Sequence, residues 1–202
     1  LAGPVTQVTG QVRLQERERL FKGARVKGFH EHYAHTYPDV QEADAPDIAM
    51  ATLEFENAAL GQWLYDQAAQ GPGFHRFTIY GSEGQMDLPG VRSGRPLRLF
   101  REDYDDMLDD DDVLALVPDF ALDDRTAYFF GGERLARYDN TQSGVGGNAD
   151  LKILAMEVGE LLDAIDNRTP VEVDPEAGLV AVALVMACHE SSEARRTVSM
   201  TE

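Results

Sequence analysis

The order of the secondary-structure patterns constrains this chain most: strand patterns fill its first half and helical patterns its last third. The strand patterns either alternate apolar and polar residues or gather β-branched and aromatic residues between turn signals. They lie at residues 5–14, 48–55, 62–65, 76–80, 85–88 and 96–100. Strands this close together, with no helix between them, are expected to pair antiparallel, because parallel neighbours need a long crossover.

Two helices are expected after the strands. The first covers residues 148–166, where Asn and Asp residues can cap the start and apolar residues recur at helical spacing, so its apolar stripe is expected to lie on the sheet. The second covers residues 174–194, with Asp174 as N-cap and Pro175 at the first helical position. Residues 196–200 could add a closing strand. This order predicts an α+β fold with a large open, mostly antiparallel sheet and helices covering one face.

Size and composition narrow the class of protein. A chain of 202 residues with 43% hydrophobic residues can bury roughly 70% of its unfolded surface, so a single domain over residues 1–202 is expected. It lacks the ~18 consecutive apolar residues of a membrane span and a signal-peptide pattern, which predicts a cytoplasmic protein with no membrane partner. A formal charge of −18 disfavours nucleic acid as a partner. The single cysteine, Cys188, lies in an apolar helical pattern and is expected in the core.

An acidic run occupies residues 102–112. It lacks the glycine at the sixth loop position and the terminal glutamate of an EF-hand. We interpret it as a solvated loop rather than a calcium site, and no metal site is predicted.

The long stretch at residues 15–47 has no regular periodicity, and loops of this length in compact domains are typically functional or disordered. Within it, residues 29–37 contain three histidines and two tyrosines. Three interpretations are open: packing within the loop, a zinc site through His30 and His32, and contact with a substrate. Imidazole and phenol groups can bind sugar hydroxyls, so His30, His32 and Tyr37 are the candidate substrate-binding residues.

Nucleotide-binding and nucleophile motifs are absent from the sequence. It contains no G-x-G-x-x-G between a strand and a helix, no G-x-x-x-x-G-K-[ST] and no G-x-S-x-G. Residues 144–148 come nearest to the first of these, but they have the wrong spacing and follow no convincing strand. We interpret them as a flexible loop before a helix.

Several short segments are informative through their order and spacing. They are residues 51–61, 77–84, 88–90, 157–165 and 170–174, followed by a helix that ends at residues 190–192. In this order they resemble the C-terminal domain of the Gfo/Idh/MocA (glucose-fructose oxidoreductase/inositol dehydrogenase) family. The resemblance covers nearly the whole chain, from about Leu1 to Val198.

The resemblance implies that cofactor binding and catalysis belong to another part of the protein. In that family an N-terminal Rossmann domain binds NAD or NADP, and an E-K-P lysine and a D-x-x-x-H segment lie at the active site. None of these is in this chain, and residues 1–8 look like the stretch directly after the D-x-x-x-H segment. We therefore assign no catalytic and no cofactor-binding residue here, and expect the Rossmann domain to lie upstream of Leu1.

The resemblance also implies a role for this part of the protein. It is expected to be the substrate-binding and dimerisation domain of an NAD(P)-dependent oxidoreductase acting on a sugar, polyol or related secondary alcohol. The fragment alone is expected to be inactive. Because the family's sheet commonly mediates subunit association, a homo-oligomer formed through the sheet face is expected.

Two other functions stay open on the residues alone. The absence of catalytic motifs is also typical of a free-standing, non-enzymatic module that self-associates or binds a ligand. The histidine cluster could instead serve a metal-dependent hydrolase, which would require stoichiometric bound metal.

Overall fold

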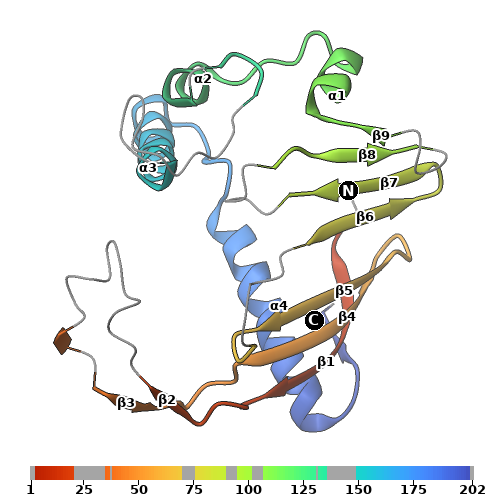
Figure 1. Cartoon of the computed structure of the whole chain (residues 1–202), viewed down its shortest axis with the longest axis vertical. Helices are drawn as coiled ribbons and strands as arrows, with labels where there is room; N and C mark the ends of the chain where they lie inside the picture. Colours follow the sequence, from red (N-terminus) through yellow and green to blue (C-terminus); the bar gives the residue numbers. More distant parts are fainter. Residues whose placement is uncertain are drawn as a thin grey trace. The chain divides into compact units, whose positions relative to one another are not determined.

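The computed structural model describes residues 3–20, 35–36, 38–69, 76–89, 95–101, 107–130, 132–135 and 149–200. The chain consists of two compact units, of which the first combines Leu1–Gly71 with Val173–Glu202 and the second is Pro72–Glu172. Both contain strands and helices (Figure 1), and all the strand pairs that the structure describes are antiparallel. The predicted α+β fold with open antiparallel sheets is confirmed.

The first unit contains a four-stranded sheet in the order β10-β1-β4-β5. Its strands are β1 (Val5–Arg13), β4 (Ile48–Phe55), β5 (Leu60–Asp66) and β10 (Val198–Ser199). Thr9 of β1 lies opposite Thr52 of β4, which in turn lies opposite Gln62 of β5. The predicted hairpin and closing strand are therefore confirmed.

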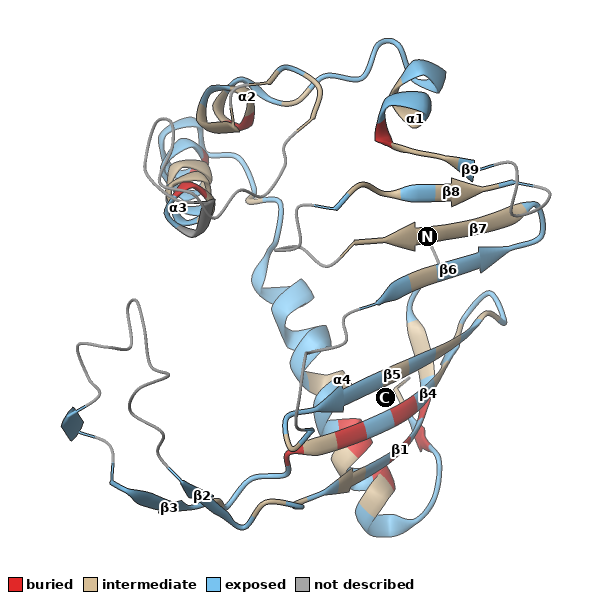
Figure 2. Ribbon diagram, in the orientation of Figure 1, coloured by how far each residue is buried: buried red, intermediate tan, exposed pale blue. Residues whose placement is uncertain are grey.

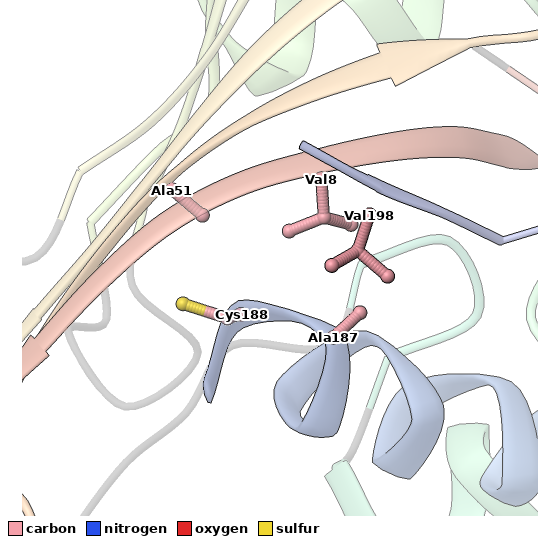
Figure 3. Close-up of a cluster of buried hydrophobic side chains, with 5 residues drawn as sticks. All are labelled: Val8, Ala51, Ala187, Cys188 and Val198. Atoms are coloured by element: carbon pink, nitrogen blue, oxygen red, sulfur yellow. The ribbon is translucent and has the colours of Figure 1, made fainter. Parts of the chain in front are cut away.

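Helix α4 (Pro175–Ala194) covers one face of this sheet, as predicted. It begins at the predicted N-cap, since the Asp174 carboxylate accepts a 2.8 Å hydrogen bond from the Ala177 amide. Figure 3 shows the resulting core of five buried side chains from β1, β4, α4 and β10. They are Val8, Ala51, Ala187, Cys188 and Val198.

Cys188 is only 1% exposed, which confirms its predicted core position, and burial raises the pKa of its thiol. The helix approaches β1 very closely here. A Cβ atom on Gly10 would lie 2.5 Å from the Cys188 Sγ, so only glycine fits at this point of the strand.

Two serines of α4 accept hydrogen bonds from backbone amides of β1 in the part of its edge that β10 does not reach. Strand β10 pairs only with Gln7 and Val8. Farther along β1, the Gly10 amide donates to the Ser191 Oγ at 2.9 Å, and the Val12 amide donates to the Ser192 Oγ at 3.0 Å. The helix thus replaces a neighbouring strand as hydrogen-bond partner.

The second unit contains the sheet β6-β7-β8-β9. Its strands are β6 (Phe77–Gly81), β7 (Gly84–Leu88), β8 (Arg98–Phe100) and β9 (Met107–Leu108). The turn between β6 and β7 requires glycine: Gly84 has a φ of 158°, and a Cβ there would lie 2.2 Å from the Phe100 carbonyl oxygen.

Three helices belong to this unit: α1 (Asp110–Leu116), α2 (Asp124–Phe130) and α3 (Ala149–Asn167). The interpretation of residues 102–112 as a solvated loop is wrong for their second half, which forms β9 and the start of α1. Asp109 is the N-cap and forms a capping box with Asp112, while the buried Asp110 carboxylate accepts a 2.7 Å hydrogen bond from the Leu97 amide. The carboxylates therefore begin a helix.

Much of α3 is exposed within its own unit (Figure 2), and this includes residues of the predicted apolar stripe. Leu154 is 55% exposed and Ile165 is 63% exposed. Within this unit α3 contacts α2, where Arg125 pairs with Asp163 and its guanidinium lies against Gly159. Helical periodicity predicted an apolar face correctly but could not predict its neighbour.

One turn offers a test of the sheet's local energetics. Between β4 and β5, the Ala58 amide donates to the Phe55 carbonyl at 2.9 Å, and Ala58 has a φ of 66°. Because glycine is favoured in this left-handed position, Ala58→Gly is expected to raise the free energy of unfolding by about 0.5–1 kcal/mol. Chemical denaturation measures the change. Ala59→Gly is the matched control and should be neutral or destabilising; equal losses in both variants would contradict the assignment.

Candidate functional site

The long stretch at residues 15–47 leaves the sheet and returns to it as an antiparallel ribbon. Strand β2 (Glu18–Leu20) pairs with β3 (Val40–Glu42), and the Ala43 amide donates to the Arg17 carbonyl at 2.8 Å. Figure 1 shows this ribbon beyond the ends of β1 and β4. The stretch predicted as an irregular loop therefore has a regular base.

Asp47 joins the base of the ribbon to the sheet. Its side chain is fully buried and accepts hydrogen bonds from the Gln15 amide at 2.7 Å and from the Glu16 amide at 2.8 Å. Its own amide donates to the Arg13 carbonyl, and its carbonyl accepts from the Gln67 amide. One residue thereby connects the end of β1, the start of the ribbon and the end of β5.

The charge of Asp47 is stabilised within the fold. The amide hydrogen bond from Gln15 holds the pKa of this carboxyl below its ordinary value of 3.8, against burial, which acts in the opposite direction. The Glu16 amide and the Arg19 guanidinium, 3.6 Å away, act in the same direction as Gln15.

The predicted substrate-binding residues His30, His32 and Tyr37 lie outside the described residues. Of the same cluster, His35 and Thr36 are described, and both are exposed in a short turn. The substrate contact of the cluster therefore stays a prediction.

A hollow lies on the sheet face opposite α4, where β10 ends. Its floor contains two rows of side chains that alternate with the buried ones along each strand. One row contains Thr9, Thr52 and Gln62. The other contains Gln11, Met50 and Leu64. The rim is formed by residues 191–193 and 195–197, and the volume is about 1010 Å³.

The strands that line this hollow were predicted, but the hollow itself was not. Alternation in residues 5–14 is enough to place Thr9, Gln11 and Arg13 on one polar face of that strand. The rim comes from a segment about 180 positions away, as the hydrogen bond between Gly10 and Ser191 shows with a separation of 181. No local signal could have brought these segments together. Asp47 was also missed, although a lone aspartate directly before a strong strand is a plausible cap.

Cofactor and metal sites were sought in the described part of the chain. It holds no group of three or more His, Cys, Asp or Glu residues placed to bind a metal ion. Its strand pairs are antiparallel, so they do not form the crevice of parallel strands and crossover helices that binds a dinucleotide in a Rossmann fold. Among the described helices, none is long and apolar enough to span a membrane.

These features define an α/β domain with open antiparallel sheets, a helix across one sheet face and a hollow on the other. The chain belongs to the Gfo/Idh/MocA oxidoreductase family as its C-terminal alpha/beta domain, since the model of that domain matches residues 25–200. The family predicted from the order of short segments is confirmed.

Solved structures share the fold. An NAD-binding oxidoreductase from Klebsiella pneumoniae is 22% identical, with a TM-score of 0.60 over 98% of this chain and 46% of that one. Levoglucosan dehydrogenase in complex with NADH is 18% identical, with a TM-score of 0.60 over 98% and 45%. The WlbA dehydrogenase from Bordetella pertussis, in complex with NADH and UDP-GlcNAcA, is 16% identical, with a TM-score of 0.55 over 100% and 44%. The chain thus spans less than half the length of these structures. No curated protein matches it in sequence.

The buried carboxylate of Asp47 predicts that the thermal stability of the domain depends on pH. Asp47→Asn places an amide where two backbone N–H groups need an acceptor, so the variant is expected to have a lower Tm at neutral pH. Because the folded-state pKa is lowered, the stabilisation by Asp47 is present above 3.8 and is lost as the pH falls through the folded value. The Tm difference from the natural chain should therefore narrow below pH 3.8.

Thermal unfolding followed by circular dichroism from neutral to acidic pH measures this difference. Asp44→Asn, at an exposed position in the same segment, is the control and should leave the Tm unchanged. A difference that stays constant across the pH range would show that the charge of Asp47 is not responsible.

Proposed function

We propose that residues 1–202 form the substrate-binding and association domain of an NAD(P)-dependent oxidoreductase that acts on a sugar, polyol or related secondary alcohol. The observation that carries this proposal is the match of residues 25–200 to the C-terminal domain of an oxidoreductase family. The relatives support the substrate class: one is named for levoglucosan, and another was solved with UDP-GlcNAcA.

In this proposal one domain binds the cofactor and the other orients the substrate. Hydride would pass between the substrate's secondary alcohol carbon and the nicotinamide, which is bound outside this chain. The part contributed here is orientation of the substrate. The sheet buries alternate residues of β1 and β4 against its core, and Asp47 fixes the base of the ribbon whose two strands come before and after the histidine cluster in the sequence.

Because the cofactor is proposed to bind outside this chain, the whole protein and residues 1–202 alone should differ in activity. The whole reading frame should encode a G-x-G-x-x-G sequence and a D-x-x-x-H segment upstream of Leu1, and its product should reduce NAD or NADP with sugars or polyols. Residues 1–202 alone should show no turnover in the same absorbance assay. A frame without a dinucleotide-binding sequence would instead favour the free-standing binding module.

His30, His32 and Tyr37 are proposed to contact the substrate. In the whole enzyme, His32→Ala is expected to raise KM about 3- to 10-fold with little change in kcat, because one hydrogen bond to a neutral hydroxyl is lost in ground and transition states alike. Steady-state kinetics measures this. His35→Ala, at an exposed position of the same cluster, is the matched control. Equal effects of both variants would refute a specific role for His32.

Association through the sheet face belongs to the same proposal. The face opposite α4 exposes Met50 and Leu64 beside a row of threonine and glutamine side chains, and Met50 is 52% exposed. A surface that mixes exposed apolar and uncharged polar side chains suits packing against the same face of a second copy.

A charge at the centre of this face should disrupt the association. Thr52 lies between Thr9 and Gln62, so Thr52→Lys would bury an unpaired ammonium in the interface and is expected to weaken dimerisation about tenfold or more. Sedimentation velocity over a range of protein concentrations measures the effect. Thr169→Lys, at an exposed turn after α3, is the control. A dimer that persists in Thr52→Lys would place the interface elsewhere.

A further inference from the structure

The sheet β6-β7-β8-β9 of the second unit has two faces of different character (Figure 1). Opposite residues of a ladder share a face, so the strand register assigns each side chain to one of them. One face is apolar and carries Phe77, Ile79, Met86, Leu88, Leu99 and Leu108. The other, here called the mixed face, carries a row of Thr78, Asp87 and Arg98 and a row of Tyr80, Gln85, Phe100 and Met107.

The charges of the mixed face differ from those of the chain as a whole. The chain has 18 basic and 36 acidic residues, so two copies repel each other over most of their surfaces. The two rows of the mixed face contain one arginine and one aspartate, and the guanidinium of Arg76 reaches the same aspartate. Two copies that approach through these rows therefore avoid the general excess of carboxylates.

Asp87 holds a fixed negative charge on this face. Its carboxylate accepts hydrogen bonds from the Thr78 hydroxyl at 2.8 Å, the Gln85 side-chain amide at 2.9 Å and the Arg76 guanidinium at 3.3 Å. Burial acts to raise the pKa of the Asp87 carboxyl, but the hydrogen bonds outweigh it and hold the pKa below its ordinary value of 3.8. The side chain is still 28% exposed, so an ionised carboxylate in one orientation faces outward.

Arg98 lies beside this carboxylate, directly opposite Asp87 in the ladder between β7 and β8. It is exposed, and among the residues that the structure describes it takes part in no ion pair. Asp87 pairs instead with Arg76. The mixed face therefore presents a negative and a positive group on neighbouring strands, with their Cα atoms roughly 5 Å apart.

This arrangement of charges is self-complementary under two-fold symmetry. In an isologous interface, a residue that contacts a second residue of the partner is matched by the reciprocal contact. If the two-fold axis passes between β7 and β8, Arg98 faces Asp87 of the partner subunit, and the reciprocal pair forms as well. Packed sheets lie about 10 Å apart, which an extended arginine and an aspartate can span together. An axis through Asp87 itself would oppose like charges, so the charges also select one orientation.

We propose that the mixed face is a self-association surface whose orientation is set by reciprocal pairing of Arg98 with Asp87 of the partner subunit. Tyr80, 72% exposed, and Met107, 41% exposed, supply apolar contact area around the two pairs. This inference rests on the association proposed above. It adds a second sheet to the interface and identifies the charged residues that determine how two copies meet.

Variants with exchanged charges test the pairing directly. In the whole protein, Arg98→Glu opposes carboxylates across the interface, and Asp87→Lys opposes cations. Each variant alone is expected to associate about tenfold more weakly than the natural chain, or weaker still. An equimolar mixture of the two restores both contacts between opposite charges and should form a heterodimer. Sedimentation velocity of each variant and of the mixture, over a range of concentrations, measures the effect.

Two further measurements separate pairing from net charge and from folding. Arg168→Glu, at an exposed position after α3, makes the same change in net charge and should associate as the natural chain does. Asp87→Lys removes the acceptor of three hydrogen bonds, so its fold is checked by circular dichroism. A double-mutant cycle with Asp87→Asn and Arg98→Gln makes milder changes and decides the question if Asp87→Lys unfolds. The loss of dimer affinity in the double variant should be smaller than the sum of the two single losses.

Three results would overturn the proposal, and they differ in what they leave standing. A natural chain that stays monomeric at all concentrations would remove both this proposal and the association on which it rests. A dimer that Thr52→Lys disrupts and Arg98→Glu leaves intact would keep the proposed association and confine its interface to the first unit. Additive losses in the cycle, with no heterodimer in the mixture, would show that Arg98 and Asp87 do not meet across the interface.

Discussion

The close contact between α4 and the middle of β1 determines the organisation of the first unit. It exists because Gly10 has no side chain, so the helix can place Cys188 directly against the strand. Val8 and Cys188 become fully buried on that side, and Ser191 and Ser192 satisfy the strand amides that β10 does not reach. Since the helix occupies one face, the alternating polar residues are left on the other, where the hollow and the proposed association surface lie.

Local patterns were sufficient to predict most of the described elements. The β4–β5 hairpin, the N-cap at Asp174 and the burial of Cys188 follow from alternation, capping chemistry and helical spacing within short windows. One feature was wrong for a physical reason. The carboxylates at residues 109–112 were interpreted only as solvated charges, although an N-cap aspartate followed three positions later by a second acid begins a helix. The packing of the α3 stripe on the sheet stays a prediction, because periodicity does not specify which surface an apolar face contacts.

The candidate site was less predictable than the fold, because it depends on residues distant in sequence. Asp47 accepts hydrogen bonds from amides 31 and 32 positions away, and the hollow is lined by residues of β1 and of the turn after α4. The family, in contrast, could be recognised from the order of several weak segments. Family membership explains why the chain has this sheet, whereas a preference for one substrate depends on individual side chains that the fold alone does not specify.

The pairing of β1 with β10 joins the first strand of this chain to its last. During synthesis, β1 emerges from the ribosome long before Ser191, Ser192 and β10 exist to satisfy its edge. Until then it can pair with β4 alone on one side, and its other edge remains open to strands of other chains. The native state therefore forms late and through contacts of high sequence separation, which favours slow folding. Premature termination near residue 190 would leave an exposed, aggregation-prone strand instead of a slightly shortened domain.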